Sequence, residues 1–482
     1  MNLLLVASEC APFVKTGGLA DVIGALPKSL APLGVQARVL LPLYPALQDL
    51  ASSATASVDL GAVLGGPARV LAVSAQGLDL LLLDAPHLFD RDGGIYLDRN
   101  GADWADNHLR FGALSKVAAR LTMDGVEGWH PDLVHVHDWQ AGLVPVYLRQ
   151  AGNQTPCVMT IHNIAFQGLF GAEVCEDLGL SRAGFTPDGF EYYGNVNFLK
   201  AGIAFSDKIT TVSPTYAREL MLAEFGMGLE GVLQARKQDL TGILNGIDLD
   251  AWNPETDAAL VAPYSIRSLK RKAENRAALE ARFDLAPNPD APLFCVISRL
   301  TSQKGLDLLL EALPDLVARG ARLALLGNGE PGLEHAFRRA ATGYPGSVGV
   351  IIGYDEQLSH LVQAGADAII IPSRFEPCGL TQLYGLRYGT LPLVARTGGL
   401  ADTVIDANEA AIAVGCATGV QFAPVTAAAL IQAIDRCCDL FSTPKTWDGM
   451  KRNAMRHPVG WDQSAQAYQT LFQALLAETP AQ

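Results

Sequence analysis

The chain has 482 residues, of which 49% are hydrophobic and 18% are charged, and its formal net charge is −14. This length predicts two large domains rather than one core. The negative charge argues against a nucleic-acid partner or a membrane partner, because phosphate-rich surfaces attract basic proteins.

The eight cysteines are scattered and form no CxxC pair, which is typical of a reduced, cytoplasmic protein. The apolar start of the chain is too short for a signal peptide and lacks its basic residues. No segment reaches the ~18 apolar residues of a membrane span. We therefore expect a cytoplasmic location.

Short apolar runs alternate with helix-length segments along the chain, which indicates βαβ units and parallel sheets. The first series predicts strands at 2–8, 36–42, 132–137, 157–161, 208–212 and 241–245. A second series, at 292–298, 321–326, 348–353, 367–371 and 391–395, follows a polar stretch. The pattern predicts two doubly wound α/β domains, 1–247 and 248–456, with a ligand cleft between them at the carboxyl ends of the strands. Residues 457–482 are predicted to form a helix, and the pattern does not decide where it packs.

In the first series, Lys15-Thr-Gly-Gly18 precedes a helix, and Arg396-Thr-Gly-Gly399 nearly repeats it in the second series. Each motif places a cation and two glycines at a helix N-terminus, where free N–H groups and the helix dipole favour an anion. The alternative is that each motif is an ordinary Gly-Gly turn before a helix, without a ligand.

Polar residues also end two strands of the first series. Asp138 could hydrogen-bond a polar ligand, whereas His135 and His137 share a strand face without a third metal ligand at suitable spacing. His162 and Asn163 could bind sugar hydroxyls or a leaving oxygen, or could be a core histidine beside a capping asparagine.

In the second series, Arg299 and Lys304 follow a strand and are well placed for a pyrophosphate. Tyr354 follows a strand too, and its ring could stack on a base or sugar, or pack against the next helix. Glu376 lies in a strand-to-helix turn, where α/β enzymes bind anionic groups. An exposed loop acid is the alternative reading of Glu376.

Two further patterns are weaker. The glycines at 327, 329 and 332 match the spacing of a dinucleotide-binding loop, but a lone match of this kind is weak evidence for NAD. Two D-x-D sequences, at 90–92 and 248–250, lie in turn-rich stretches. Neither a cofactor nor a metal is therefore expected.

Together the motifs resemble the bacterial glycogen synthase and plant starch synthase family over nearly the whole chain. The matching segments are 15–18, 137–139, 161–163, 167–168, 211–216, 228–233, 244–248, 298–300, 303–305, 353–354, 372–380 and 397–402. The resemblance implies the GT-B fold, with two Rossmann-like domains. It also implies a retaining enzyme that transfers glucose from ADP-glucose to the non-reducing end of an α-1,4-glucan such as glycogen, without a metal.

The resemblance also implies roles for individual residues. Those expected to be catalytic are Glu376, His162 and Asp138. Those expected to bind substrate are Lys15, Gly18, Asn163, Asn245, Arg299, Lys304, Tyr354, Cys378, Gly379, Leu380 and Thr381. Many related retaining transferases carry a second glutamate eight positions after the first, and here that position is Tyr384. Two alternatives stay open: a UDP-glucose-using enzyme of the same fold, and a non-catalytic nucleotide-sugar-binding or glucan-binding protein.

Overall fold

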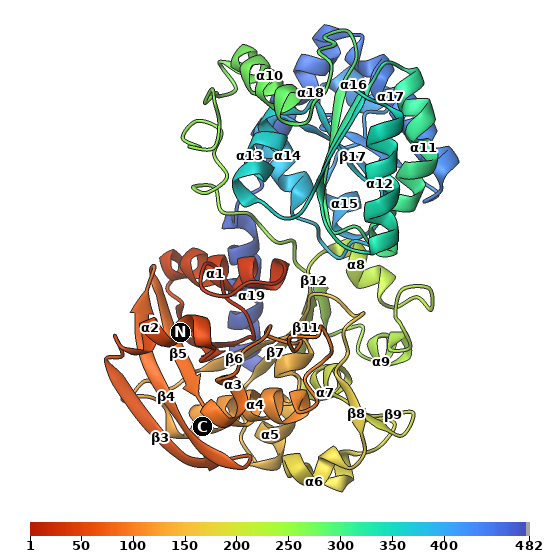
Figure 1. The fold of residues 1–482 in the computed structure, drawn as a ribbon. Helices are drawn as coiled ribbons and strands as arrows, with labels where there is room; N and C mark the ends of the chain where they lie inside the picture. Colours follow the sequence, from red (N-terminus) through yellow and green to blue (C-terminus); the bar gives the residue numbers. More distant parts are fainter. Residues whose placement is uncertain (479–482) are drawn as a thin grey trace. The chain divides into compact units, whose positions relative to one another are not determined.

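The structure is a computed structural model that describes residues 1–478. It consists of two compact units (Figure 1). The first unit contains Met1–Asn245 and the segment from Trp461 onward, and the second contains Gly246–Gly460. Each unit has a parallel or mainly parallel sheet flanked by helices, which confirms the predicted α/β class. Within residues 1–478, none of the helices combines the length and the apolar character that crossing a bilayer requires.

The first unit is built on a nine-stranded sheet with the order β12-β11-β7-β6-β1-β2-β5-β4-β3. Seven neighbouring strands, from β12 to β5, are parallel, and β4 and β3 extend the sheet antiparallel. The strands are β1 (Asn2–Val6), β2 (Gln36–Pro42), β3 (Ala56–Val63), β4 (Gly66–Ala75), β5 (Leu78–Asp84), β6 (Leu133–His137), β7 (Cys157–Ile161), β11 (Lys208–Thr211) and β12 (Leu240–Gly242). A small second sheet pairs β8 (Leu169–Gly171), β10 (Asn195–Asn197) and β9 (Glu191–Tyr192).

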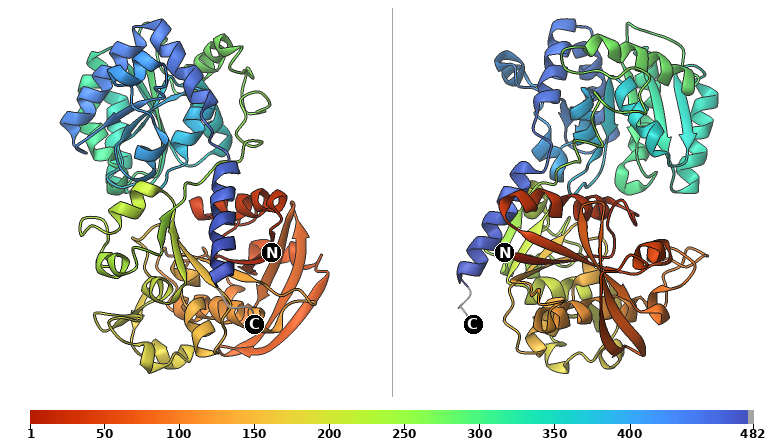
Figure 2. Two further views of the ribbon diagram at one scale, coloured as in Figure 1. Left: turned by 180° about the vertical axis from the view of Figure 1, so that it is seen from behind. Right: turned by 90° about the vertical axis from the view of Figure 1, so that its left-hand side faces the viewer.

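Helices connect these strands, and one helix comes from the far end of the chain. They are α1 (Gly18–Leu30), α2 (Gln48–Ala51), α3 (Pro86–Phe89), α4 (Asn107–Asp124), α5 (Val144–Gln150), α6 (Val174–Leu178), α7 (Phe198–Phe205), α8 (Pro214–Glu219), α9 (Glu230–Ala235) and α19 (Asp462–Glu478). The rings of Tyr468 and Phe472 lie 5.3 and 5.5 Å from the ring of His135, and α19 runs beside α1 (Figure 2). Helix α19 therefore completes the first unit, which the sequence pattern left undecided.

The second unit has a six-stranded parallel sheet with the order β15-β14-β13-β16-β17-β18. Its strands are β13 (Leu293–Ile297), β14 (Arg322–Gly327), β15 (Val348–Ile352), β16 (Ala368–Ile371), β17 (Leu391–Ala395) and β18 (Val420–Phe422). Its helices are α10 (Lys272–Arg282), α11 (Leu306–Ala318), α12 (Pro331–Gly343), α13 (Glu356–Gly365), α14 (Thr381–Tyr388), α15 (Gly398–Thr403), α16 (Glu409–Val414), α17 (Ala427–Phe441) and α18 (Pro444–Arg456).

Helices cover both faces of this second sheet, because its strands are apolar on both sides. Phe294 and Val296 of β13 point into one core, whereas Leu293 and Cys295 point into the other. Burial on both faces is typical of parallel sheets. The chain reverses its direction across the sheet between β13 and β16, which is the switch point where doubly wound folds bind ligands.

All eleven predicted strands are present, with ends shifted by at most three residues. Strand β5 was not predicted, although its run from Leu80 to Leu83 is entirely apolar and buried. Strands β3, β4 and β18 and the small sheet were not predicted either. Strand β3 is buried only at alternate or scattered positions, so it carries no continuous apolar run.

Candidate active site

In the first unit, the loop between β1 and α1 is organised around Glu9, a buried carboxylate that sequence analysis did not single out. Oε2 of Glu9 accepts hydrogen bonds from the N–H groups of Thr16 at 2.5 Å and Gly17 at 3.1 Å. Oε1 accepts from the hydroxyls of Thr16 and Tyr96, both at 2.6 Å. The N–H groups predicted to bind a ligand anion are therefore held by an internal carboxylate. The only sequence signal was a lone acid shortly after a strand end.

Lys15 and Gly18 lie on the exposed side of this loop. Nζ of Lys15 lies 2.8 Å from Oδ1 of Asp21, and both side chains are about one-third exposed. An ion pair this exposed is weak. Lys15 can therefore leave Asp21 for a stronger anionic partner at little cost.

Asp138 and His162 come together because β6 and β7 are neighbouring parallel strands, so their carboxyl ends meet at one edge. Oδ1 of Asp138 accepts the N–H of His162 at 2.7 Å, and Asp138 has a φ of 53°, which side-chain-bearing residues rarely adopt. Burial raises the pKa of Asp138 to about 7; the N–H groups of His162 and Asn163 lower it, and the charge of Glu9 adds to the rise.

The histidines of this edge are neutral. Nδ1 of His137 lies 2.9 Å from Nε2 of His162, and burial lowers the pKa of His162 to about 3. Nε2 of His135 lies 2.6 Å from the hydroxyl oxygen of Thr160, and the ring of His135 lies 4.1 Å from that of His137, tilted by 41°. Within residues 1–478, no group of three histidine, cysteine or acidic side chains is arranged to hold a metal ion. His135 and His137 are both fully buried.

Asn163 and Asn245 differ in how their amides are used. Oδ1 of Asn163 accepts the N–H of Ala165 at 3.0 Å, so Asn163 forms an Asx turn in the loop after β7. Asn245 follows β12 and is 9% exposed, and its buried Oδ1 has no hydrogen-bond partner among the described residues. A buried acceptor without a donor is costly, so this oxygen is available to a ligand hydroxyl or N–H.

In the second unit, Glu376 is a buried acid paired with a cation. Its Oε2 lies 2.6 Å from Nζ of Lys304 and accepts the hydroxyl of Ser373 at 2.8 Å. The side chains of Glu376 and Lys304 are 9% and 18% exposed. Gly305 permits this approach, because a Cβ there would lie 2.0 Å from the carbonyl oxygen of Pro372. The alternative reading of Glu376 as an exposed loop acid is wrong.

The second Gly-Gly motif, Gly398-Gly399, packs against the backbone of the Glu376 loop. The N–H of Gly399 donates to the carbonyl oxygens of Glu376 and Pro377, both at 3.1 Å. Gly398 has a φ of 44°, and a Cβ there would lie 1.9 Å from the carbonyl oxygen of Glu376. This motif therefore positions the loop, whereas the sequence suggested a second anion site.

Directly after Glu376 the chain enters α14. Cys378 is 5% exposed, and Gly379 has a φ of 71°, which suits glycine. The N–H groups of Leu380 and Thr381 meet no acceptor within residues 1–478. These two donors, with the positive end of the helix dipole, point to an anion at this position.

Two further predicted residues lie at the same carboxyl edge of the second sheet. Arg299 follows β13, is exposed and forms no ion pair with the described residues. Tyr354 follows β15, is 68% exposed and donates its hydroxyl to Glu356 at 3.0 Å. Tyr384, at the position of the second glutamate of related enzymes, stacks on Trp252 with ring centres 3.6 Å apart.

Comparison with known proteins shows the family of the chain. The model of the starch synthase catalytic domain matches residues 2–235, and that of glycosyl transferases group 1 matches residues 278–454. A glycogen synthase of Roseobacter denitrificans is 68% identical over 99% of this chain and 100% of its own length. One of Paracoccus denitrificans is 58% identical with the same coverage. The chain belongs to the glycogen synthase and starch synthase family.

A solved structure agrees with this membership. The catalytic domain of starch synthase IV from Arabidopsis thaliana, bound to ADP and acarbose, is 31% identical. It matches with a TM-score of 0.87 over 99% of both chains. The predicted GT-B fold is confirmed, and as a member of the glycogen synthase family the chain is a retaining glycosyltransferase.

Proposed function

We propose that this enzyme transfers glucose from ADP-glucose to the non-reducing end of an α-1,4-glucan such as glycogen, with retention and release of ADP. The observation that carries the proposal is the buried Glu376–Lys304 pair directly before the open N-terminus of α14. The glycogen synthase relatives, and the starch synthase bound to ADP and acarbose, support the choice of donor and acceptor.

The departing diphosphate needs positive charge. Breaking the bond between the anomeric carbon and the phosphate oxygen leaves negative charge on ADP. Lys304, Arg299 and the N–H groups of Leu380 and Thr381 would stabilise that charge, and Lys15 would bind the same diphosphate. Each preorganised contact of this kind is worth on the order of 10²–10³ in rate. We propose that these groups take the place of a divalent metal.

Glu376 would stabilise the positive charge that develops on the sugar. Two donors already occupy its Oε2, which suits an electrostatic role better than a nucleophilic one. Retaining hydrolases use two carboxylates about 5 Å apart, whereas the ring of Tyr384 occupies the position of a second glutamate and stacks on Trp252.

We therefore propose attack on the same face of the sugar. The acceptor 4-hydroxyl oxygen bonds to the anomeric carbon as the bond to the phosphate oxygen breaks. The acceptor's proton passes to the departing phosphate. A glucosyl adduct trapped on Glu376 would contradict this route.

The edge that carries Asp138 and His162 would hold the glucose. A neutral imidazole can donate to or accept from a hydroxyl, and Asp138, with its pKa near 7, can do either according to pH. Asn163, Asn245, Cys378 and Gly379 are proposed to contact the donor sugar or its phosphate. Gly18 is proposed to let the Lys15 loop close over the donor. Tyr354 is proposed to stack near the adenine.

We also propose that the enzyme is cytoplasmic and has neither nucleic acid nor membrane as a partner, in keeping with its net charge of −14.

The proposed transfer reaction can be tested with a labelled donor. The enzyme is incubated with glycogen and labelled ADP-glucose or UDP-glucose, in the presence of EDTA. Nucleotide release and polymer label are followed, and β-amylase then releases the label as maltose if the new linkage is α-1,4 at a non-reducing end.

We expect label from ADP-glucose to enter the polymer at an unreduced rate in EDTA. Equal or faster use of UDP-glucose would favour the alternative donor. Binding of ADP-glucose without transfer would favour a non-catalytic protein.

A further inference from the structure

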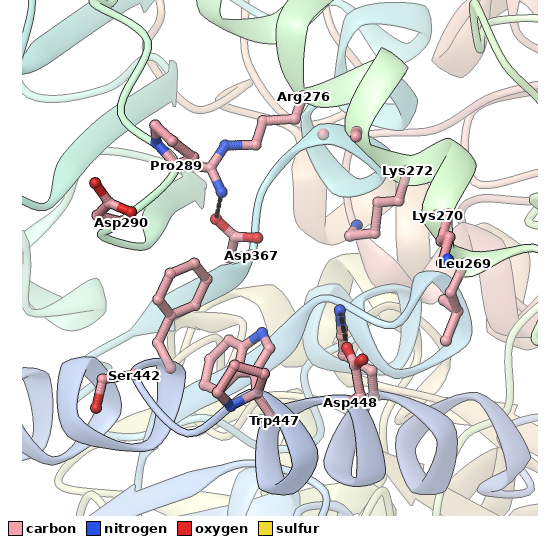
Figure 3. A pocket seen from close by; sticks show the side chains of 15 residues that line it. Leu269, Lys270, Lys272, Arg276, Pro289, Asp290, Asp367, Ser442, Trp447 and Asp448 are labelled. Carbon is pink, nitrogen blue, oxygen red and sulfur yellow. Dashed lines mark hydrogen bonds and ion pairs between the residues drawn. The ribbon is translucent and has the colours of Figure 1, made fainter.

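The second unit contains a pocket of about 650 Å³ that lies far from Glu376 in the fold (Figure 3). Asp290 and Asp367 line it shortly before β13 and β16, so it opens at the amino edge of the sheet. Glu376, Arg299 and Tyr354 lie at the opposite, carboxyl edge. The first turns of α10 and α18 form its other walls. Its size is in the usual range for a small-molecule site.

Basic groups predominate in this pocket although the chain is strongly acidic. Lys270, Lys272, Arg276 and Lys451 line it together with three aspartates. Arg276 and Asp367 neutralise each other at 2.7 Å (Figure 3), and Oδ2 of Asp367 also accepts the N–H of Leu293. Lys270 is exposed and forms no ion pair with the described residues.

Asp290 also lines the pocket and disfavours an anion, whereas Lys451 and two helix dipoles favour one. Lys451 pairs at 2.7 Å with Asp448, which is 57% exposed, so this pair is weak. Helices α10 and α18 direct their positive ends toward the pocket, and neither has a side-chain cap.

Trp447 points to a ligand independently of these charges. Its side chain rises from α18 toward the pocket (Figure 3), and the residue is 3% exposed. Its buried Nε1 has no hydrogen-bond partner among the described residues. An unsatisfied buried donor is unfavourable, and a ligand oxygen would satisfy it. The adjacent Phe441, which is only partly buried, offers ring surface to a flat or cyclic ligand.

We propose that this pocket binds a small organic phosphate of monosaccharide size, and that its occupancy is coupled to the nucleotide site through Lys272 and α14. The phosphate would meet Lys451 and Lys270, the ring would lie against Phe441, and an oxygen of the ligand would accept the Nε1–H of Trp447. The coupling rests on the proposed function only in so far as ADP binds at the N-terminus of α14.

Lys272 provides the connection between the two edges of the sheet. Its ammonium donates to the carbonyl oxygens of Gln363 at 3.1 Å and Ala364 at 2.7 Å, in the last turn of α13. It also donates to the carbonyl of Tyr388, at the end of α14, at 3.4 Å and to the hydroxyl of Thr390 at 2.7 Å. Helix α14 begins at Thr381, so one helix joins Lys272 to the predicted phosphate-binding N–H groups.

A change in the protonation of Lys272 could carry the effect of a ligand in the pocket to α13 and α14. Burial lowers its pKa to about 7, Asp367 and Cys295 oppose that change, and Lys451 and Arg276 add to it. An anion in the pocket favours the charged ammonium, which makes stronger hydrogen bonds to the ends of α13 and α14 than the neutral amine does.

Binding is tested on the full chain by calorimetry with ribose 5-phosphate, inorganic phosphate and glucose, with saturating ADP present to fill the nucleotide site. Ribose 5-phosphate should bind, and inorganic phosphate should bind more weakly. Lys451→Glu and Lys270→Glu should each weaken binding about tenfold or more. Lys445→Glu is the matched control, because Lys445 is exposed on α18 outside the pocket. Lys451→Gln replaces Lys451→Glu if the latter does not fold.

Three results would overturn the site: no saturable binding of ribose 5-phosphate up to about 10 mM, an equal loss of ribose 5-phosphate affinity in Lys445→Glu, or binding of glucose as tight as that of ribose 5-phosphate.

The coupling is tested by the Kd of ADP with and without ribose 5-phosphate. We expect a change of about fivefold or more, matched by the reciprocal change in ribose 5-phosphate affinity. An unchanged Kd of ADP would overturn the coupling. None of these measurements requires glucose transfer, so their failure is distinct from failure of the proposed function.

Discussion

Replacement of Gly398 by alanine is the sharpest test of how the fold positions Glu376. A Cβ at Gly398 would lie 1.9 Å from the carbonyl oxygen of Glu376 and 2.8 Å from its carbonyl carbon. Real Cβ atoms stay at least 3.0 Å from such atoms, so the Cβ–oxygen distance must grow by more than 1 Å. The backbone φ of 44° adds strain of about 1–2 kcal/mol for a side-chain-bearing residue.

Because the clash is with the Glu376 backbone itself, the loop must move. A displacement of about 1 Å in a catalytic group can lower the rate about 10²-fold. We therefore expect Gly398→Ala to lower kcat by roughly that factor and to lower the free energy of unfolding by about 2–4 kcal/mol, from strain and overpacking together.

Gly415→Ala is the matched control. Gly415 has a φ of 71°, so alanine there is strained too, but nothing lies within 4 Å of its Cβ position. This control should lose about 1–2 kcal/mol of stability and keep its kcat. Initial rates with ADP-glucose and glycogen, together with thermal unfolding, measure both quantities. A Gly398→Ala enzyme with near wild-type kcat would refute the reasoning.

Three other predictions concern Glu376, Lys15 and Asp138. Glu376→Gln keeps an acceptor for Lys304 but loses the charge, so kcat should fall by about 10²–10³ with little change in Tm; an unchanged kcat would exclude an electrostatic role. Lys15→Ala should raise the KM for ADP-glucose about fivefold or more, since a charged contact to phosphate is worth about 1 kcal/mol or more; steady-state kinetics with an unaltered KM would remove Lys15 from the donor site. Burial raises the pKa of Asp138 from 3.8 to about 7, so the folded protein holds a proton that the unfolded chain releases. The stability contribution of Asp138 therefore falls as pH rises from 3.8 to about 7; Asp138→Asn should flatten Tm against pH over that range, and identical profiles would show that Asp138 does not titrate there.

Most of the parallel strands could be predicted from sequence because each is a short apolar run that must be buried on both faces, although β5 and β18 are parallel too and were missed. The edge strand β3 and its antiparallel neighbour β4 could not, because strands with one solvated face carry a weaker pattern. Glu376, Arg299 and Lys304 could be singled out because each follows a predicted strand, and carboxyl ends of parallel strands meet at one edge. Glu9 and Tyr96 could not, because their hydrogen bond joins residues 87 positions apart.

The sequence by itself determined which segments form strands and helices and which polar residues lie at the carboxyl edges, since both depend on local periodicity and on the order of elements. Only the tertiary structure decided how those residues are paired. It paired Lys304 with Glu376, and it showed that the N–H groups of Thr16 and Gly17 donate to Glu9. It also showed that the second Gly-Gly motif packs against the Glu376 loop and that α19 belongs to the first unit. These outcomes depend on distances between segments remote in the chain, and such distances are set by packing of the whole unit rather than by any local pattern.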